Sequence, residues 1–332
     1  FKYAYLDHIQ YLNAIFYQKF VNKNIKIYSN RFPRSIIKTK QKNIEKLFEI
    51  EFKKKSYTKK QSDKIIRSSK KIFSSLRNYL PWMHYTTYSI LKNKDLKKFE
   101  YIIYAHSFTD SQLEFKYDGF INTLEWLAFT VNELKKKNKN FIIKAHPNFY
   151  VKSTIKGINE VAAWDKKIYD KFIKNLVDDK RILILDKPIL NYDVATRLNK
   201  KCIVITKHGN VQLEMVYHNF KVITSKSNFI NTKYSISNTW SNKFEYKNLL
   251  KKDWDALKLA KKQNFYSVME NLFMDENKAY GKNHYLNVLK NYMSKLKLIS
   301  KNSSYEEMIL KFNKIKNKDD VWKKIVLPIK EV

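Results

Sequence analysis

The sequence predicts an α/β protein in which helices cover both faces of a parallel sheet. Short continuous apolar runs recur from residue 98 onward, and stretches with apolar residues at helical spacing separate them. Strands buried on both faces lack the alternation of half-exposed strands, and parallel strands need a crossover between them, usually a helix. The chain has 332 residues, of which 44% are hydrophobic, so it is long and apolar enough for two domains.

Residues 1–97 predict part of an N-terminal domain. Residues 25–28 are typical of a short strand, and a helix precedes them where apolar residues follow helical spacing, at Leu12, Ile15, Phe16 and Phe20. The Lys-rich segment 38–80 predicts two basic amphipathic helices that either face solvent or contact a membrane or a lipid-linked acceptor. Because the chain begins with Phe1 rather than Met, we expect a fragment of a longer protein.

Residues 98–250 predict the parallel-sheet domain. Strands are expected at 101–106, 141–146, 181–186, 202–206 and 221–225. Helical patterns lie between them, near 119–137, 158–176, 191–199 and 210–218. Ligands of such sheets bind at the carboxyl ends of the strands, so functional side chains are expected directly after each strand.

Residues 251–332 predict a mostly helical tail. One helix is expected to begin with Trp254, Leu257, Leu259 and Ala260, and another at Tyr285, Val288, Leu289 and Met293. The polar segment 274–281 separates the two.

The turn Lys207-His208-Gly209 is the leading candidate for a binding site. It ends a predicted strand and leads into a predicted helix, and it holds one of only four glycines in the chain. Backbone N–H groups at a helix N-terminus attract an anion, and glycine lets a ligand approach the backbone. The alternative is an ordinary β-α turn.

Three of the seven histidines end predicted strands of one sheet, which predicts a shared site. Lysine and histidine there can neutralise and hydrogen-bond a phosphate. Two roles are open for Asp110: it acts as a general base, or it caps the following turn. Two are also open for Glu214: it accepts hydrogen bonds from ribose hydroxyls, or it complements the helix dipole. The expected catalytic residues are His106, Asp110 and His146. The expected ligand-binding residues are Lys144, His146, Pro147, Asp186, Lys207, His208, Gly209, Asn210 and Glu214.

The formal net charge of +35 comes mainly from lysine, which is dispersed along the chain beside abundant Asn, Ile, Tyr and Phe. Nucleic-acid-binding proteins concentrate their basic residues and often prefer arginine. Dispersed lysine is more typical of the codon bias of an AT-rich genome. We therefore expect attraction to anionic membrane surfaces or phosphate-bearing substrates, and no nucleic-acid partner.

Several kinds of site do not fit the sequence. There is no HExxH, GxxxxGK[ST], GxGxxG or GxSxG motif, and the single cysteine, Cys202, has no partner. These absences argue against zinc, a P-loop, NAD and an α/β-hydrolase, so we expect no metal and no bound cofactor. The lone cysteine fits a reducing cytoplasm, and no apolar run reaches the length of a membrane span.

The motifs, taken in order, resemble those of bacterial capsule and surface-polysaccharide glycosyltransferases of the GT-B fold. They are Ala105-His-Ser-Phe-Thr-Asp110, Glu125-Trp-Leu127, Ile143-Lys-Ala-His-Pro147, Thr206-Lys-His-Gly-Asn-Val-Gln-Leu-Glu214 and Lys221-Val-Ile223. Some of these enzymes transfer Kdo from CMP-Kdo. The His-Pro step is also similar to that of GT-B sialyltransferases, which contacts CMP phosphate. Teichoic-acid glycerophosphotransferases and UDP-GlcNAc epimerases have a similar His-Pro step and Gly-to-Glu turn.

The resemblance covers about residues 98–235 and implies that His146, His208, Gly209 and Glu214 line a nucleotide. It implies a GT-B-like fold, with a Rossmann-like C-terminal sheet, a partial N-terminal domain on the acceptor side and a helical tail. The implied activity is sugar transfer from a donor such as CMP-Kdo or a related CMP-sugar to a capsule or lipopolysaccharide-type glycan.

The implied partners are the nucleotide-sugar and a glycan or lipid-linked acceptor. The implied location is the cytoplasm, with peripheral binding to the inner face of the bacterial membrane as an option. Two alternatives stay open: a glycerol- or ribitol-phosphate transferase of the same fold, and a non-enzymatic basic protein that binds membrane or nucleic acid.

Overall fold

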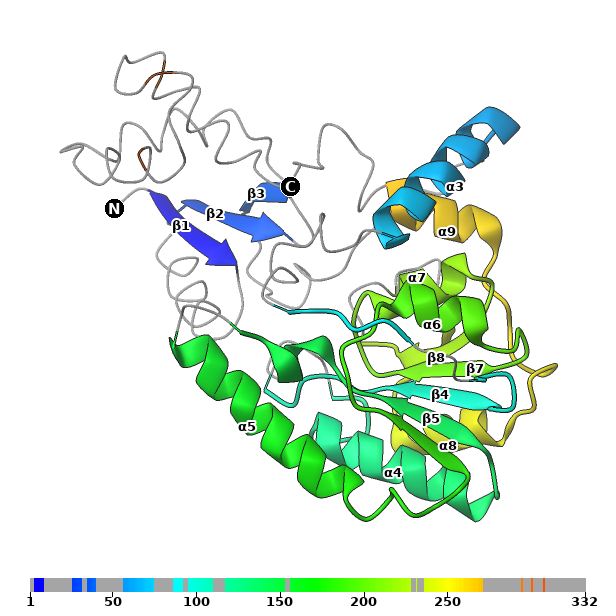
Figure 1. Cartoon of the computed structure of the whole chain (residues 1–332). Helices are drawn as coiled ribbons and strands as arrows, with labels where there is room; N and C mark the ends of the chain where they lie inside the picture. Colours follow the sequence, from blue (N-terminus) through cyan, green and yellow to red (C-terminus); the bar gives the residue numbers. More distant parts are fainter. Residues whose placement is uncertain are drawn as a thin grey trace. The chain divides into compact units, whose positions relative to one another are not determined.

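The computed structural model divides into two compact units, one of residues Phe1–Lys46 with Asn271–Val332 and one of Leu47–Glu270 (Figure 1). The residues that it describes are 3–8, 26–31, 35–39, 56–74, 86–91, 95–109, 117–152, 156–227, 231, 236–270, 294, 300 and 307.

The first unit contains a three-stranded sheet. Its strands are β1 (Tyr3–His8), β2 (Lys26–Arg31) and β3 (Ser35–Thr39). β1 pairs with β2 in parallel, and β2 pairs with β3 in the antiparallel sense. The predicted strand at 25–28 is confirmed as part of β2. The predicted helix over 12–20 lies outside the described residues.

The second unit is built on a six-stranded sheet, and every strand pair in it is parallel. The strands are β4 (Tyr101–Tyr104), β5 (Phe141–Lys144), β6 (Ile182–Leu185), β7 (Ile203–Thr206), β8 (Lys221–Ser225) and β9 (Asn238–Trp240). The predicted α/β class is therefore confirmed, and so are the five predicted strands. β9 was not predicted, because its three residues are too short to form a recognisable pattern.

Helices cover both faces of this sheet. They are α4 (Thr123–Lys136), α5 (Lys156–Ile173), α6 (Asn191–Arg197), α7 (Val211–Tyr217), α8 (Lys243–Lys251) and α9 (Lys262–Met269), with the short 3-10 helix η3 (Pro147–Tyr150). Figure 1 shows α6 and α7 on one face of the sheet and α4 and α8 on the other. Among the described helices, none combines the length and the apolar character needed to cross a bilayer.

The strand order is β6-β5-β4-β7-β8-β9, so β4 lies beside β7 in the middle of the sheet. The chain first builds outward from β4 through β5 to β6, and then returns to the other side of β4 for β7, β8 and β9. The strand order therefore reverses between β4 and β7. In open α/β sheets, ligands bind at the carboxyl ends of the strands beside such a switch point.

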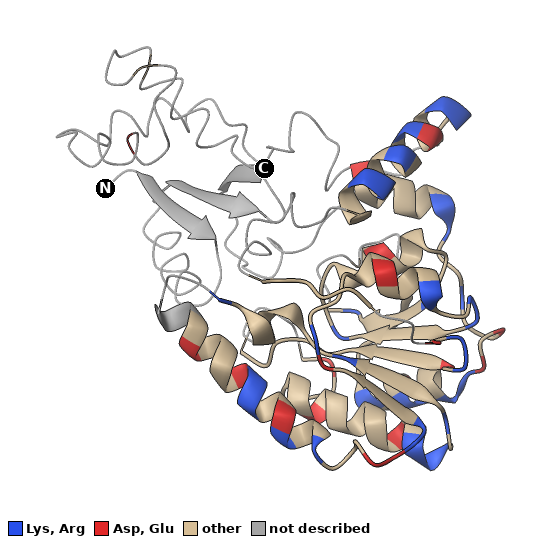
Figure 2. Ribbon diagram, in the orientation of Figure 1, with Lys and Arg blue, Asp and Glu red and all other residues tan. Residues whose placement is uncertain are grey.

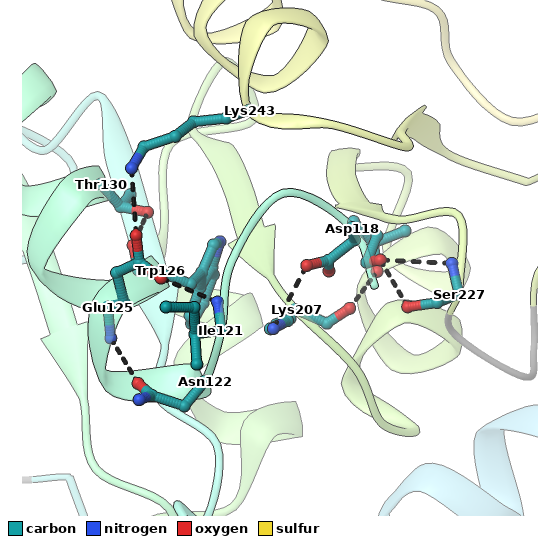
Figure 3. Close-up of polar contacts among 11 residues, drawn as sticks. Asp118, Ile121, Asn122, Glu125, Trp126, Thr130, Lys207, Ser227 and Lys243 are labelled. Carbon is teal, nitrogen blue, oxygen red and sulfur yellow. Dashed lines mark hydrogen bonds and ion pairs between the residues drawn. The ribbon is translucent and has the colours of Figure 1, made fainter. Parts of the chain in front are cut away.

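α4 and α8 begin with the same motif. An asparagine side chain accepts from the amide of a glutamate three residues later, and that glutamate accepts from the amide of the residue before the asparagine. In α4 the side chain of Asn122 accepts from the Glu125 amide at 2.8 Å, and Glu125 accepts from the Ile121 amide at 2.7 Å (Figure 3). In α8 the Asn242 side chain accepts from the Glu245 amide at 2.9 Å, and Glu245 accepts from the Ser241 amide at 2.7 Å. The two helices pack against each other on one face of the sheet.

One predicted helix start is wrong. Residues 254–256 form a turn, and the helix begins only at Lys262. Side chains from the sheet occupy the backbone groups that a helix would use: Lys221 donates to the carbonyl of Trp254 at 2.7 Å. Asn238 donates to the carbonyl of Lys258 at 2.9 Å and accepts from its amide at 2.9 Å. The helix predicted over 285–293 lies outside the described residues.

The second basic helix of the segment 38–80 is confirmed as α3 (Lys59–Ser74). Its apolar residues Ile65, Ile72 and Phe73 are buried, and it packs beside α9. The apolar face of α3 is therefore already covered within the protein, and its lysines face solvent. The first basic helix, expected around Ile44 to Phe48, lies outside the described residues.

Candidate active site

Three histidines come together at the carboxyl ends of adjacent strands. His106 follows β4, His146 follows β5 and His208 follows β7. The ring centroids of His106 and His146 are 5.2 Å apart, and those of His106 and His208 are 5.8 Å apart. The parallel register of β5, β4 and β7 places their carboxyl ends side by side, so residues distant in sequence meet beside the switch point.

Local hydrogen bonds fix the orientation of each histidine segment. Nδ1 of His146 accepts from the Asn148 amide at 3.2 Å, so the hydrogen of the neutral ring lies on Nε2. Nδ1 of His106 lies 3.1 Å from the Ser107 carbonyl oxygen, which can only accept, so that nitrogen carries a hydrogen. The hydroxyl of Thr206 donates to the carbonyl of His208 at 2.8 Å. The first two bonds define the hydrogen-bearing ring nitrogens of His106 and His146, and the third fixes the backbone of His208.

His208 is almost fully buried, with 2% of its surface exposed. Burial, with smaller effects of His106 and Lys207, holds the pKa of His208 well below its usual value. At neutral pH the ring is therefore uncharged. It can hydrogen-bond a phosphate but does not neutralise its charge.

Gly209 and Asn210 lead from β7 into α7. Gly209 has a φ of +101°, which residues with a Cβ rarely adopt. An added Cβ there would meet the His106 ring at 3.8 Å and nothing closer, so the backbone at this point is open. The side-chain oxygen of Asn210 is buried without a hydrogen-bond partner among the described residues, and it does not cap α7.

Lys207 is paired with a buried aspartate. Its Nζ lies 3.3 Å from Oδ1 of Asp118, and both side chains are nearly inaccessible (Figure 3). Burial lowers the pKa of Lys207, and Asp118 opposes that shift. The carbonyl of Lys207 also accepts from the Thr224 hydroxyl at 3.0 Å and the Ser225 amide at 3.2 Å. These contacts fix the turn that carries His208.

Lys144 and Glu214 lie in the interior rather than at exposed strand ends, with 2% and 3% of their surfaces exposed. Burial lowers the pKa of Lys144 to about 8 and raises that of Glu214 to about 7, and each charge opposes the shift of the other. The Lys144 ammonium lies 5.6 Å from the centre of the Tyr104 ring, and Asn191 of α6 donates to Glu214 at 3.0 Å. Lys144 of β5 and Glu214 of α7 are therefore close enough for the charge of each to affect the other.

The other predicted site residues lie at the edges of this cluster. Pro147 begins η3, and its carbonyl accepts from Thr86 at 3.5 Å. Asp186 is exposed after the edge strand β6, and its charge adds to the effect of burial in raising the pKa of Tyr150, so it lies near η3. No contact places Asp186 among the histidines in the described part of the chain. Asp110 lies outside the described residues.

Two buried carboxylates at the site were not predicted. Asp118 precedes Gly119, one of the four glycines, and that scarcity could have marked its turn. Asp165 lies on α5 between Ala162 and Tyr169, on a stripe that is otherwise apolar and buried. A carboxylate at such a position is a recognisable signal, because a buried charge needs dedicated partners.

No group of three His, Cys, Asp or Glu side chains in the described ranges has an arrangement that could hold a metal ion. The three histidines thus form a cluster of hydrogen-bonding imidazoles. Their geometry suits an anion with several oxygens, such as a phosphate.

No protein-family model matches the chain, and no curated protein matches it. Among solved structures, the chain is similar to the beta Kdo 2,4 transferase KpsC of Thermosulfurimonas dismutans, with 10% identity and a TM-score of 0.45, over 80% of this chain and 78% of that one. It is also similar to the UDP-GlcNAc 2-epimerase of Methanocaldococcus jannaschii, solved with UDP-GlcNAc and UDP, with 13% identity and a TM-score of 0.34. That similarity covers 63% of this chain and about half, 52%, of the epimerase. Similarity of this degree concerns the fold alone.

Proposed function

We propose that the chain is a GT-B glycosyltransferase that takes its sugar from a nucleotide-activated donor. The observation that carries the proposal is the convergence of His106, His146 and His208 at the ends of three adjacent parallel strands. Open α/β sheets bind nucleotides at such strand ends, and imidazole donors suit phosphate oxygens. The motif resemblance over residues 98–235 supports the same conclusion.

The histidines would act on the leaving phosphate. Glycosyl transfer breaks the bond between the anomeric carbon and a phosphate oxygen, so negative charge grows on that oxygen. His146 offers its Nε2–H, because its Nδ1 already accepts from the backbone. Donors held in place before the reaction stabilise this charge without having to reorganise. We therefore propose that transfer proceeds without a metal.

Donor, acceptor and location follow from the resemblance and from the charge. We propose a CMP-sugar such as CMP-Kdo as donor and a capsule or lipopolysaccharide-type glycan as acceptor. In this proposal residues 98–250 bind the nucleotide-sugar, residues 1–97 contribute to the acceptor side, and residues 251–332 form a helical tail. The net charge of +35 favours a cytoplasmic protein that associates with the inner face of the bacterial membrane.

A phosphotransferase of the same fold is the main alternative, with the histidines stabilising a transferred glycerol- or ribitol-phosphate group. The two reactions give different products. Phosphotransfer leaves a phosphodiester in the elongated acceptor, which ³¹P NMR detects, whereas sugar transfer adds a glycosidic bond without phosphorus. A purely basic binding protein predicts one continuous basic face. In Figure 2 basic residues are spread over several elements, and acidic residues lie among them on α5, which favours the enzyme.

His146→Ala is expected to weaken nucleotide binding about tenfold to a hundredfold, because a charge-assisted hydrogen bond to phosphate is lost. The fold should change little, since His146 is only half-buried at a strand end. Thermal-shift screening against CMP, CDP, UDP and GDP first identifies the nucleotide, and calorimetric titration then gives the affinities.

His218→Ala is the matched control for that experiment. It removes an imidazole from the carboxyl end of α7, where His218 packs on Tyr192 and Tyr217. Nucleotide affinity should be unchanged in this variant. If His146→Ala binds nucleotide as tightly as His218→Ala, His146 does not contact the phosphate.

Gly209→Val is expected to reduce nucleotide affinity by more than it reduces stability. The positive φ makes any side chain cost about 1 kcal/mol or more, but the Cβ itself meets no close neighbour. A ligand packed on this backbone would be displaced by the side chain and would lose hydrogen bonds worth roughly 1.5–3 kcal/mol each. Urea unfolding gives the change in stability of this variant, and calorimetry gives the change in its nucleotide affinity. Lower stability with normal affinity in the folded protein would make the turn purely structural.

A further inference from the structure

The loop that follows β4 is held by one buried carboxylate on another element. Asp165 of α5 has 1% of its surface exposed. Its Oδ2 accepts from the hydroxyl of Ser107, and from that of Thr109 at 3.1 Å. Phe108, between those two residues, stacks on Phe149 with ring centroids 5.7 Å apart. One α5 side chain therefore binds both ends of the segment 107–109.

No lysine or arginine among the described residues is paired with the buried Asp165. In the described part of the chain no lysine or arginine lies within ion-pair distance of it, and its Oδ1 has no hydrogen-bond partner. Burial raises the pKa of Asp165. Its hydrogen bonds to Ser107, Thr109 and the Phe108 backbone oppose that shift, and so does the charge of His106. Asp170, on the same helix, is different: it is half-exposed and bonded to Lys166 at 2.5 Å. A buried carboxylate whose partners all belong to one loop suits the task of positioning that loop.

The same loop carries His106, the histidine in the middle of the three. Ser107, bound by Asp165 through its hydroxyl, binds His106 through its carbonyl, 3.1 Å from Nδ1. The Cδ2–Nε2 edge of the His106 ring faces Gly209. Asp165 is thus connected to His106 by two consecutive hydrogen bonds through a single intervening residue.

We propose that Asp165 is a positioning residue, which fixes the place and the tautomer of His106 by holding Ser107 and Thr109. The proposal rests on the glycosyltransferase function for its effect on turnover. A group displaced by about 1 Å can lose a hundredfold in rate. Asp165→Asn should therefore lower kcat about tenfold to a hundredfold. Nucleotide affinity should stay within about threefold, because His146, His208 and the backbone at Gly209 still contact the phosphate.

The test combines a structural and a kinetic readout. ¹⁵N-edited NMR of the seven histidines is recorded for the wild-type chain, Asp165→Asn and the matched control Asp170→Asn. The Nδ1 and Nε2 signals of His106 should move in Asp165→Asn only. Ser107→Ala should reproduce the shift and the loss of kcat, and combining it with Asp165→Asn should add little further loss. If Asp165→Asn does not fold, Ser107→Ala with Thr109→Val serves in its place.

Two results would overturn the proposal: unchanged His106 signals in a folded Asp165 variant, or fully additive losses in the double variant. Failure of the glycosyltransferase function has a different signature. The wild-type chain would then bind no nucleotide and transfer no sugar, while the NMR comparison would still decide whether Asp165 positions His106.

Discussion

Gly119→Ala is expected to destabilise the unit Leu47–Glu270 by about 2–4 kcal/mol. Gly119 has a φ of +98° in the turn before α4. An added Cβ would lie 2.2 Å from the amide nitrogen of Lys243 and 2.8 Å from the carbonyl carbon of Asn242. Both atoms are backbone at the start of α8, which no rotamer change can move aside. The variant must therefore separate the two helix starts or unfold them.

Urea unfolding followed by circular dichroism measures this effect. Gly209→Ala is the matched control, because Gly209 has nearly the same φ, +101°, but its Cβ would meet only the His106 ring at 3.8 Å. The control should lose about 1 kcal/mol from backbone strain alone. Equal losses in the two variants would contradict the close approach of α4 and α8 at Gly119.

The fold could be predicted from sequence where the evidence is local. Continuous apolar runs such as 101–104 and 141–144 mark strands buried on both faces, and the patterns between them mark the covering helices. The helix expected at Trp254 shows the limit of that approach. Its apolar spacing is real, but Asn238 and Lys221, from β9 and β8, bind the backbone that a helix needs. Such tertiary competition leaves no local signal.

The candidate site, too, could be predicted only in part from the sequence. Three histidines could be placed together because parallel strands share one carboxyl edge, a consequence of topology alone. The direction of side chains could not be predicted in strands buried on both faces, since both faces are apolar. Lys144 is buried and is influenced by the charge of Glu214, and the phosphate contact expected for it stays a prediction. Asp118 and Asp165 come from a turn and a helix whose contacts with the strand ends exist only in the folded chain.

Lys207→Met is expected to cost about 3–5 kcal/mol, because it leaves the Asp118 carboxylate buried without its cation. Replacing both residues, Asp118→Leu with Lys207→Met, should cost much less than either single change, since the remaining charge is then also removed. Lys243→Met is the matched control. Lys243 pairs with Glu125 at 3.0 Å in a far more exposed setting, so its loss should cost about 0–1 kcal/mol.

The dependence of stability on pH provides an independent check of the ion pair between Lys207 and Asp118. Burial lowers the pKa of Lys207, and Asp118 is the main group that opposes this. In Asp118→Asn the lysine should therefore lose its proton at a lower pH in the folded chain than in the unfolded chain. Between those two pKa values the unfolded state binds more protons, so the stability of the variant should rise with pH. Urea midpoints measured from about pH 7 to about pH 9 should rise for Asp118→Asn relative to the wild-type chain. Parallel curves would mean that Lys207 reaches solvent without Asp118 and that the turn carrying His208 does not depend on this ion pair.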